Sequence, residues 1–162
     1  MAQPHERYLS EAEVGGLIPH ERPFRFIGGV TILEPGKKAR APLADLTHPD
    51  FDYLKAHFPG GQIIPGVILV EALAELLGTT AASGGGNFDG KIGVFRKIRE
   101  FSFRRPVKPT DSVMLETELI ALRHGVGIGQ VRAFLGENLA ADGVISFALV
   151  DKEQLKLMLQ TS

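Results

Sequence analysis

The residues best suited to chemistry are one histidine and two glutamates around a single apolar segment. His57 precedes this segment, and Glu71 and Glu75 are the only charged residues within positions 67–77. Residues four apart lie one above the other on the same face of a helix. A carboxylate in an apolar setting is costly to bury unless it is paired, protonated or functional. We therefore expect at least one of the two glutamates to have a raised pKa.

These residue types suit proton transfer beside a carbonyl group. An imidazole such as His57 is a base near neutral pH, and a protonated carboxyl is a useful acid. The helix is predicted to begin at Pro65, so the N–H groups of Gly66 and Val67 have no partner within it and can stabilise an oxygen that becomes negative. The set suits proton removal with loss of a leaving group. A structural histidine and a glutamate paired with an arginine are the alternatives.

The elements that must position these residues predict an α+β domain. Ser10 and Glu13 predict a capping box that opens a short helix ending before Pro19. The long apolar helix is expected to run from Pro65 to about Ala82, where a glycine-rich stop follows. Strands are expected at residues 24–33, 37–43, 91–105, 112–123, 126–135 and 139–150, with a loop at 45–64 and a short last helix using Leu155, Met158 and Leu159. Tight turns between strands imply an antiparallel sheet wrapped around the one apolar helix.

Composition excludes several function classes. The chain has 162 residues, which fits a single domain over residues 1–162, and its net charge of -1 provides no field for nucleic acid. There is no cysteine, no signal-peptide pattern and no apolar run long enough to span a bilayer. We therefore expect a cytoplasmic protein without membrane insertion. The remaining histidines have no metal-ligand spacing, so no metal site is expected: His5, His20, His48 and His124.

Several motifs in one order resemble a known family. The central ones are His57-Phe58-Pro59-Gly60, Pro65-Gly66-Val67 and Glu71-Ala72. Others lie at Ile18-Pro19-His20 and Phe103-Arg104-Arg105-Pro106. Together they resemble the hot-dog-fold (3R)-hydroxyacyl-acyl-carrier-protein dehydratases of type II fatty acid synthesis.

The resemblance implies a fold, a reaction and an assembly. The fold would be a hot dog, and the protein a homodimer or trimer of dimers in which His57 and Glu71 meet from opposite subunits. The substrate would be a β-hydroxyacyl chain on the phosphopantetheine arm of acyl carrier protein, converted to a trans-2-enoyl thioester without a cofactor. His57 would take the α-proton, Glu71 would assist departure of the hydroxyl and Gly66 would hold the thioester oxygen, with Phe58 and Val67 beside the substrate.

Departures from the family pattern indicate a divergent member, serving fatty acid or polyketide synthesis. Glu75 stands where the family usually has glutamine and is a candidate modulator of Glu71, and Gln62 stands where a proline is usual. A basic group is expected to dock the carrier protein, with a solvated strand face as the alternative: Arg96, Lys97, Arg99, Arg104 and Arg105. Two other functions stay open, a hot-dog acyl thioesterase and a non-catalytic subunit of a heteromeric dehydratase.

Overall fold

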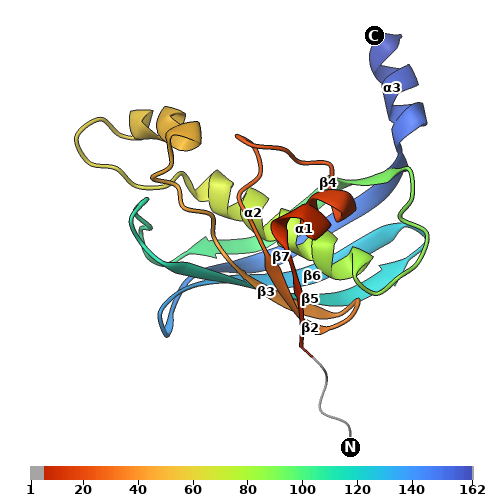
Figure 1. Cartoon of the computed structure of the whole chain (residues 1–162), viewed down its shortest axis with the longest axis horizontal. Helices are drawn as coiled ribbons and strands as arrows, with labels where there is room; N and C mark the ends of the chain where they lie inside the picture. The colour runs from red at the N-terminus through yellow and green to blue at the C-terminus, as the bar shows by residue number, and fades with distance from the viewer. Residues whose placement is uncertain (1–5, 162) are drawn as a thin grey trace, which may run out of the picture.

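The computed structural model describes residues 6–161, and its centre is one helix held by a curved antiparallel sheet (Figure 1). The seven strands follow the order β1-β2-β3-β5-β6-β7-β4, and every neighbouring pair is antiparallel. This is the hot-dog arrangement that the resemblance implies. The strands are β1 Arg7–Leu9, β2 Val30–Glu34, β3 Lys38–Pro42, β4 Lys91–Phe103, β5 Val113–Arg123, β6 Val126–Leu135 and β7 Asn138–Asp151.

The central helix α2 spans Gly66–Ala82 and confirms the predicted apolar segment. Pro65 occupies its N-cap position, and Ser83 caps its other end before the glycines. α2 packs against β3, β5 and β6, so the main core lies between this helix and the concave face of the sheet. Because the helix is apolar on nearly every side, its burial supplies much of the hydrophobic stabilisation of the fold.

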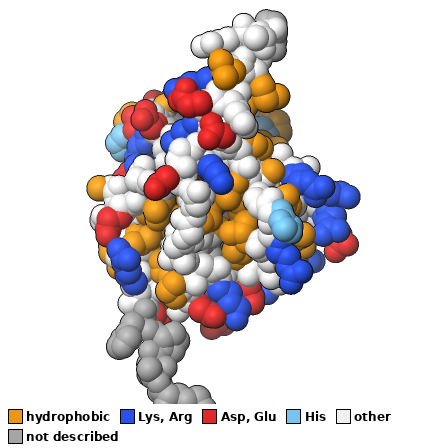
Figure 2. All heavy atoms as spheres, turned by 90° about the vertical axis from the view of Figure 1, so that its right-hand side faces the viewer, with side chains coloured by type: hydrophobic (Ala, Val, Ile, Leu, Met, Phe, Trp, Pro, Cys, Tyr) orange, Lys and Arg blue, Asp and Glu red, His pale blue; other side chains and the backbone are white. Residues whose placement is uncertain are grey.

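The two shorter helices also follow their sequence signals. α1 (Glu11–Leu17) opens with the expected reciprocal capping box between Ser10 and Glu13. α3 (Lys152–Gln160) begins at Asp151, whose side chain accepts two backbone N–H groups. This last helix projects from the body of the molecule, and Figure 2 shows hydrophobic side chains exposed on it at the top of the view. No helix within residues 6–161 is long and apolar enough to cross a membrane.

Two expectations for the N-terminal half were wrong. The strand predicted over residues 24–33 is confined to Val30–Glu34. Before it, Ile27 forms only an isolated bridge with Leu43, and the N–H groups of Phe26 and Ile27 face the buried carboxyl of Glu75. The short β1 was not expected, and it pairs with β2. The predicted loop at 45–64 contains a 3₁₀ segment, η1, over Pro49–Ala56.

β4 is an edge strand of the sheet, so one side of its backbone has no strand beside it among the described residues. It is the second longest strand, and three of its large apolar side chains are exposed: Phe95, Ile98 and Phe103. A long, apolar and unpaired edge is a template for pairing with another chain. This edge matters for the site because it passes over both halves of the predicted chemistry.

Candidate active site

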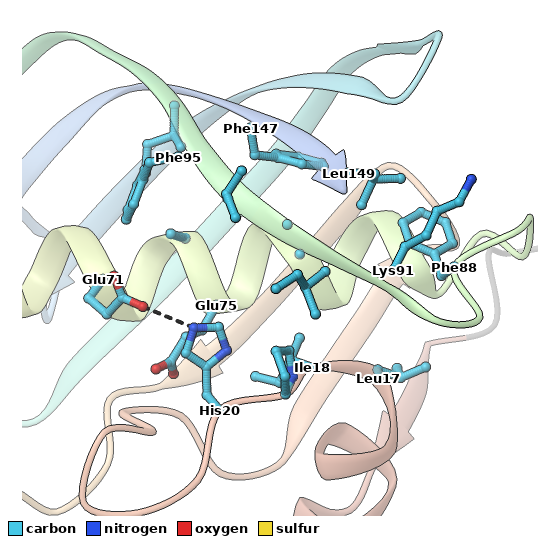
Figure 3. A pocket seen from close by; sticks show the side chains of 17 residues that line it. Leu17, Ile18, His20, Glu71, Glu75, Phe88, Lys91, Phe95, Phe147 and Leu149 are labelled. Atoms are coloured by element: carbon cyan, nitrogen blue, oxygen red, sulfur yellow. Dashed lines mark ion pairs between the residues drawn. The ribbon is translucent and has the colours of Figure 1, made fainter. Parts of the chain in front are cut away.

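Glu71 lies at the mouth of an apolar cavity of about 290 Å³ between α2, β4 and β7, which we call the Glu71 cavity (Figure 3). Its polar end is formed by His20, Glu71 and Glu75. Its walls are aliphatic and aromatic, including Ile92, Val94, Phe95, Phe147 and Leu149, and Phe88 and Lys91 lie at the far end. A cavity of this kind can hold an apolar chain with one reacting end beside the acids.

Glu71 is paired with a histidine that sequence reasoning had set aside. His20 Nε2 lies 3.1 Å from Glu71 Oε1, and both side chains are partly buried. This hydrogen bond and the negative charges of the two glutamates raise the pKa of His20 above its ordinary value, against the opposing effect of burial. His20 therefore holds a proton more firmly than an ordinary imidazole, and its Nε2 is placed to pass that proton to Glu71. The motif Ile18-Pro19-His20 was a signal for this residue, but its spacing from Glu71 in sequence gave no indication of contact.

Glu75 is the buried acid that the sequence predicts. It is 1% exposed, and its Oε2 accepts a hydrogen bond from the backbone N–H of Phe26 at 2.9 Å. Burial raises the pKa of Glu75 to about 8, a shift that the backbone bond and His20 only partly offset. Glu75 thus carries a proton at neutral pH. The expectation that at least one of the two glutamates has a raised pKa is confirmed, for the glutamate not assigned to catalysis.

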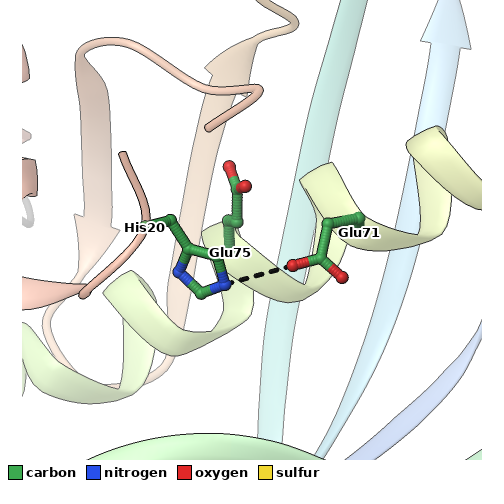
Figure 4. A group of neighbouring side chains, drawn as sticks. All are labelled: His20, Glu71 and Glu75. Carbon is green, nitrogen blue, oxygen red and sulfur yellow. Dashed lines mark ion pairs between the residues drawn. The ribbon is translucent and has the colours of Figure 1, made fainter. Parts of the chain in front are cut away.

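His20, Glu71 and Glu75 are residue types that can bind a metal ion, and they lie close together. A ring nitrogen and one oxygen from each glutamate lie within 4.8 Å of one another (Figure 4). A metal-binding histidine usually donates its other N–H to a partner, yet His20 Nδ1 is buried without one among the described residues. Glu75 is moreover neutral rather than charged near pH 7. The arrangement fits shared protons better than a metal ion.

His57 lies in a second, more open hollow of about 400 Å³, which we call the His57 pocket. Its Nδ1 lies 3.0 Å from the carbonyl oxygen of Ile63. A carbonyl oxygen only accepts, so Nδ1 carries the proton in this bond and Nε2 of the neutral ring is free to act as a base. Phe58 stacks on the imidazole with ring centroids 4.2 Å apart and is itself exposed. The bond to Ile63 and this stacking fix the ring's orientation.

The start of α2 forms one wall of the His57 pocket. Gly66 and Val67 line it, and the first helical hydrogen bond in this region is made by Ile68 N to Pro65 O at 2.9 Å. The N–H groups of Gly66 and Val67 therefore precede the intrahelical ladder, as the sequence predicts. Gly66 also has a packing role, since a Cβ there would come within 2.6 Å of the Phe103 ring.

Within one chain the two candidate catalytic residues are not brought together. Glu71 lines its cavity with Phe95 of β4, whereas His57 lines its pocket with Phe103 of the same strand. Neither hollow contains both residues. A single chain thus offers a base at one end of β4 and an acid at the other. Their cooperation in catalysis stays a prediction that requires two chains.

The predicted docking residues are all exposed, on or just after β4. Arg104 also makes an ion pair with Asp142, with Nε and Oδ1 2.8 Å apart, so the structural alternative applies to this residue. Arg104 and Arg105 line the His57 pocket. Arg96, Lys97 and Arg99 form no ion pair that the described residues show. A docking role for the group therefore stays a prediction.

The hot-dog fold and the polar residues around the first half of its apolar helix define the class of the protein. The family model described as a FabA-like domain matches residues 18–143, which is most of the chain. The chain belongs to the FabA-like family.

Curated relatives extend this similarity over nearly the whole chain. The 3-hydroxyacyl-[acyl-carrier-protein] dehydratase FabZ of Symbiobacterium thermophilum is 40% identical over 136 residues, covering 83% of this chain and 93% of that protein. The FabZ of Clostridioides difficile is 37% identical over 144 residues, covering 89% of this chain and 99% of that one.

Solved structures support the fold. The dehydratase heterocomplex ApeI:P from Xenorhabdus doucetiae matches with a TM-score of 0.72 at 15% identity, over 94% of this chain and 99% of that one. The fluoroacetyl-CoA thioesterase FlK matches with a TM-score of 0.64 at 14% identity, over 80% of this chain and 96% of that one. At such low identity these likenesses show the fold alone, and a dehydratase and a thioesterase on one fold show that the fold does not determine the reaction.

Proposed function

We propose that the protein dehydrates (3R)-hydroxyacyl thioesters carried on acyl carrier protein to trans-2-enoyl thioesters, in fatty acid or polyketide synthesis in the cytoplasm. Relatives named as dehydratases of this type, nearly 40% identical over most of the chain, support the reaction. The observation that carries the site assignment is the state of His57, whose Nδ1 proton is held by Ile63 O while Nε2 stays free.

The chemistry follows from the prepared protonation states. His57 Nε2 takes the proton from the α-carbon, and the electron pair of that C–H bond forms the new double bond as the β C–O bond breaks. Glu71, whose Oε1 lies 3.1 Å from His20 Nε2, gives a proton to the departing hydroxyl, which leaves as water. The Gly66 N–H stabilises the negative charge that develops on the thioester oxygen. Afterwards His57 loses its proton and Glu71 regains one, which restores the starting state.

A homodimer would unite the two halves of the site. Arg99 lies midway between Phe95 and Phe103 in β4. If two copies of this edge strand pair antiparallel about a two-fold axis near Arg99, Phe95 of one chain faces Phe103 of the other. The Glu71 cavity of each protomer then adjoins the His57 pocket of its partner. The exposed apolar side chains of β4 support this pairing, and trimers of such dimers are compatible with it.

The acyl chain and its carrier have separate places in this proposal. The apolar walls of the Glu71 cavity would receive the acyl chain, while Val67 and Phe58 flank the entrance beside His57. The basic residues on and after β4 would attract the acidic surface of an acyl carrier protein. Opposite charges of this kind chiefly accelerate encounter and set orientation. The reaction as proposed needs no cofactor.

The test is a product assay with purified protein and carrier-linked 3-hydroxyacyl substrates of graded length, read by mass. The proposal predicts loss of one water and appearance of enoyl absorbance. Release of free thiol without enoyl product would instead identify a thioesterase. Absence of both activities, with dehydration recovered only on adding a second dehydratase-like chain, would identify a non-catalytic subunit and contradict the homodimeric site.

A further inference from the structure

Glu75 is a buried ionisable group for which the proposed reaction has no task. It lies one helical turn from Glu71 on the same face of α2, and Figure 4 shows both beside the imidazole of His20. One of its oxygens, Oε2, accepts a hydrogen bond from the backbone N–H of Phe26, which lies in the same loop before β2 as His20. The other, Oε1, is buried without a hydrogen-bond partner among the described residues.

We propose, building on the dehydratase function above, that Glu75 is a positioning residue that acts through His20 and must be neutral for Glu71 to deliver its proton. In its neutral form it leaves Glu71 as the one acidic side chain paired with His20 among the described residues, with 3.1 Å between His20 Nε2 and Glu71 Oε1. Its bond to Phe26 holds the His20 loop against α2 at the same time. Glu75 thus sets both the position and the charge of His20, which in turn supports Glu71.

Loss of the proton from Glu75 would work against the reaction. Glu71 becomes negative as it protonates the departing hydroxyl, and a carboxylate one turn away disfavours a second negative charge in an apolar setting. An ionised Glu75 would also compete with Glu71 for His20. Because burial raises the pKa of Glu75 to about 8, this inhibition would develop in mildly alkaline solution, where most surface carboxylates do not change.

The charged surroundings of Glu75 determine how this titration is read. His20 faces it from the loop before β2, Glu71 from α2 and Tyr53 from η1. Arg25, in the same loop as His20, acts on His20, whose pKa its charge lowers. Arg25 is held by Glu11 at 2.8 Å. The pKa of Tyr53 is raised by burial and then by the charge of Glu75, so it stays neutral where Glu75 ionises. His20 therefore is the neighbour whose proton responds most directly to Glu75.

The experiment compares the pH dependence of kcat and KM for the wild type and Glu75→Gln, each with the same carrier-linked 3-hydroxyacyl substrate. Glutamine keeps the size of the side chain and an oxygen for the Phe26 N–H, but it cannot ionise. The wild type is expected to lose kcat about tenfold for each pH unit above pH 8, with KM little changed. The Glu75→Gln profile, scaled to its own maximum, is expected to stay flat over that interval. Glu137→Gln, at an exposed β-turn, is the matched control and should follow the wild type.

A second pair of variants tests the route through His20. Removing the donor in His20→Ala is expected to lower kcat by about ten- to a hundredfold with KM nearly constant. His20→Gln, which can present an N–H to Glu71 Oε1, is expected to recover part of that loss. His124→Asn, at an exposed turn with positive φ, is the histidine control. Circular dichroism and thermal unfolding of each variant show that it is folded.

The outcomes separate this inference from the proposed function. If the wild type forms no enoyl product at any pH, the dehydratase proposal fails. If the wild type is active but Glu75→Gln loses kcat at the same pH, Glu75 has no such role while the dehydratase proposal stands. Equal losses in His20→Ala and His20→Gln, or losses in KM rather than kcat, would overturn the route through His20.

Discussion

The Glu71 cavity and the His57 pocket differ in how far a single chain completes them. The cavity is the more enclosed of the two, and its acid already has a partner in His20 and a protonated neighbour in Glu75. The pocket is open, and its base is oriented by Ile63 O but faces no acid of its own chain among the described residues. Both lie under the same unpaired edge strand, β4. The acid half is thus built within the protomer, while the base half is presented at an edge.

The two halves of the site therefore differ in what they cost the stability of the fold. Burying Glu75 costs free energy that burying a leucine would not. This cost falls beside Glu71, where proton transfer requires a dry, preorganised setting. The base needs only a fixed tautomer and access to a neighbouring chain, so it tolerates exposure.

Removing either reacting group should nearly abolish turnover. His57→Ala loses the base, and Glu71→Gln keeps a side chain that can accept from His20 but cannot supply a proton. Each is expected to lower kcat by about two to four powers of ten, measured by enoyl formation from a 3-hydroxyacyl thioester. Turnover close to that of the wild type in either variant would contradict the site. His48→Gln, on an exposed segment outside both hollows, is the control histidine.

A substitution that prevents pairing of two β4 strands should lower activity without changing His57 or Glu71. Ile98 is exposed in β4 close to the proposed two-fold axis. In Ile98→Glu, pairing of two copies would bring two carboxylates together in an apolar contact, so we expect monomers by light scattering and activity reduced by about tenfold or more. Ile120→Glu, also exposed but on β5 in the interior of the sheet order, should stay dimeric. Monomeric wild-type protein with full activity would refute the shared edge.

The acid half should leave a signature in stability as well as in rate. The pKa of Glu75 rises from 4.5 in the unfolded chain to about 8 in the fold. Between these values the folded state binds more protons than the unfolded chain. The contribution of Glu75 to the free energy of unfolding is therefore fully present below pH 4.5 and is lost as pH rises towards 8.

Glu75→Gln removes this dependence. Relative to that variant, the free energy of unfolding of the wild type should fall by up to about 1.4 kcal/mol per pH unit over this window. Urea unfolding at several pH values and one fixed protein concentration measures it. Parallel curves for the two proteins would mean that Glu75 is not protonated in the fold.

The smallest expected effect concerns carrier docking. Arg105 is exposed beside the His57 pocket, and Arg105→Ala should raise KM for a carrier-linked substrate a few-fold while leaving KM for a carrier-free thioester unchanged. The difference should shrink at high salt, because screening weakens exposed charges. Lys156→Ala on α3 is the control for loss of one positive charge. Equal changes with both substrates would assign Arg105 to the pocket rather than to docking.

Sequence reasoning could predict the fold wherever local signals agree with tertiary packing. The capping box at Ser10, the proline before Gly66 and the tight turns between the last four strands are local, and each element appeared. The strand over residues 24–33 failed because a long-range bond, from Phe26 N to Glu75, overrides the local pattern.

The site shows the same limit. The apolar surroundings of Glu71 and Glu75 can be read from sequence, and they predicted a raised pKa that the structure places on Glu75. The contact of His20 with Glu71 joins residues about fifty positions apart in the sequence. The local pattern of apolar and polar residues cannot predict a contact between such distant positions. The raised pKa of Glu75 also depends on burial and on neighbours that only the fold brings together.

The most direct test of the central claim uses purified hybrid dimers, isolated by two different tags on the subunits. A hybrid of His57→Ala with Glu71→Gln contains one site with both reacting groups intact if each site takes His57 from one chain and Glu71 from the other. The account predicts about half of the wild-type activity for this hybrid, and almost none for a hybrid of wild type with the double variant His57→Ala, Glu71→Gln. The reverse pattern, with the first hybrid inactive and the second half active, would contradict a site shared across the β4 edge.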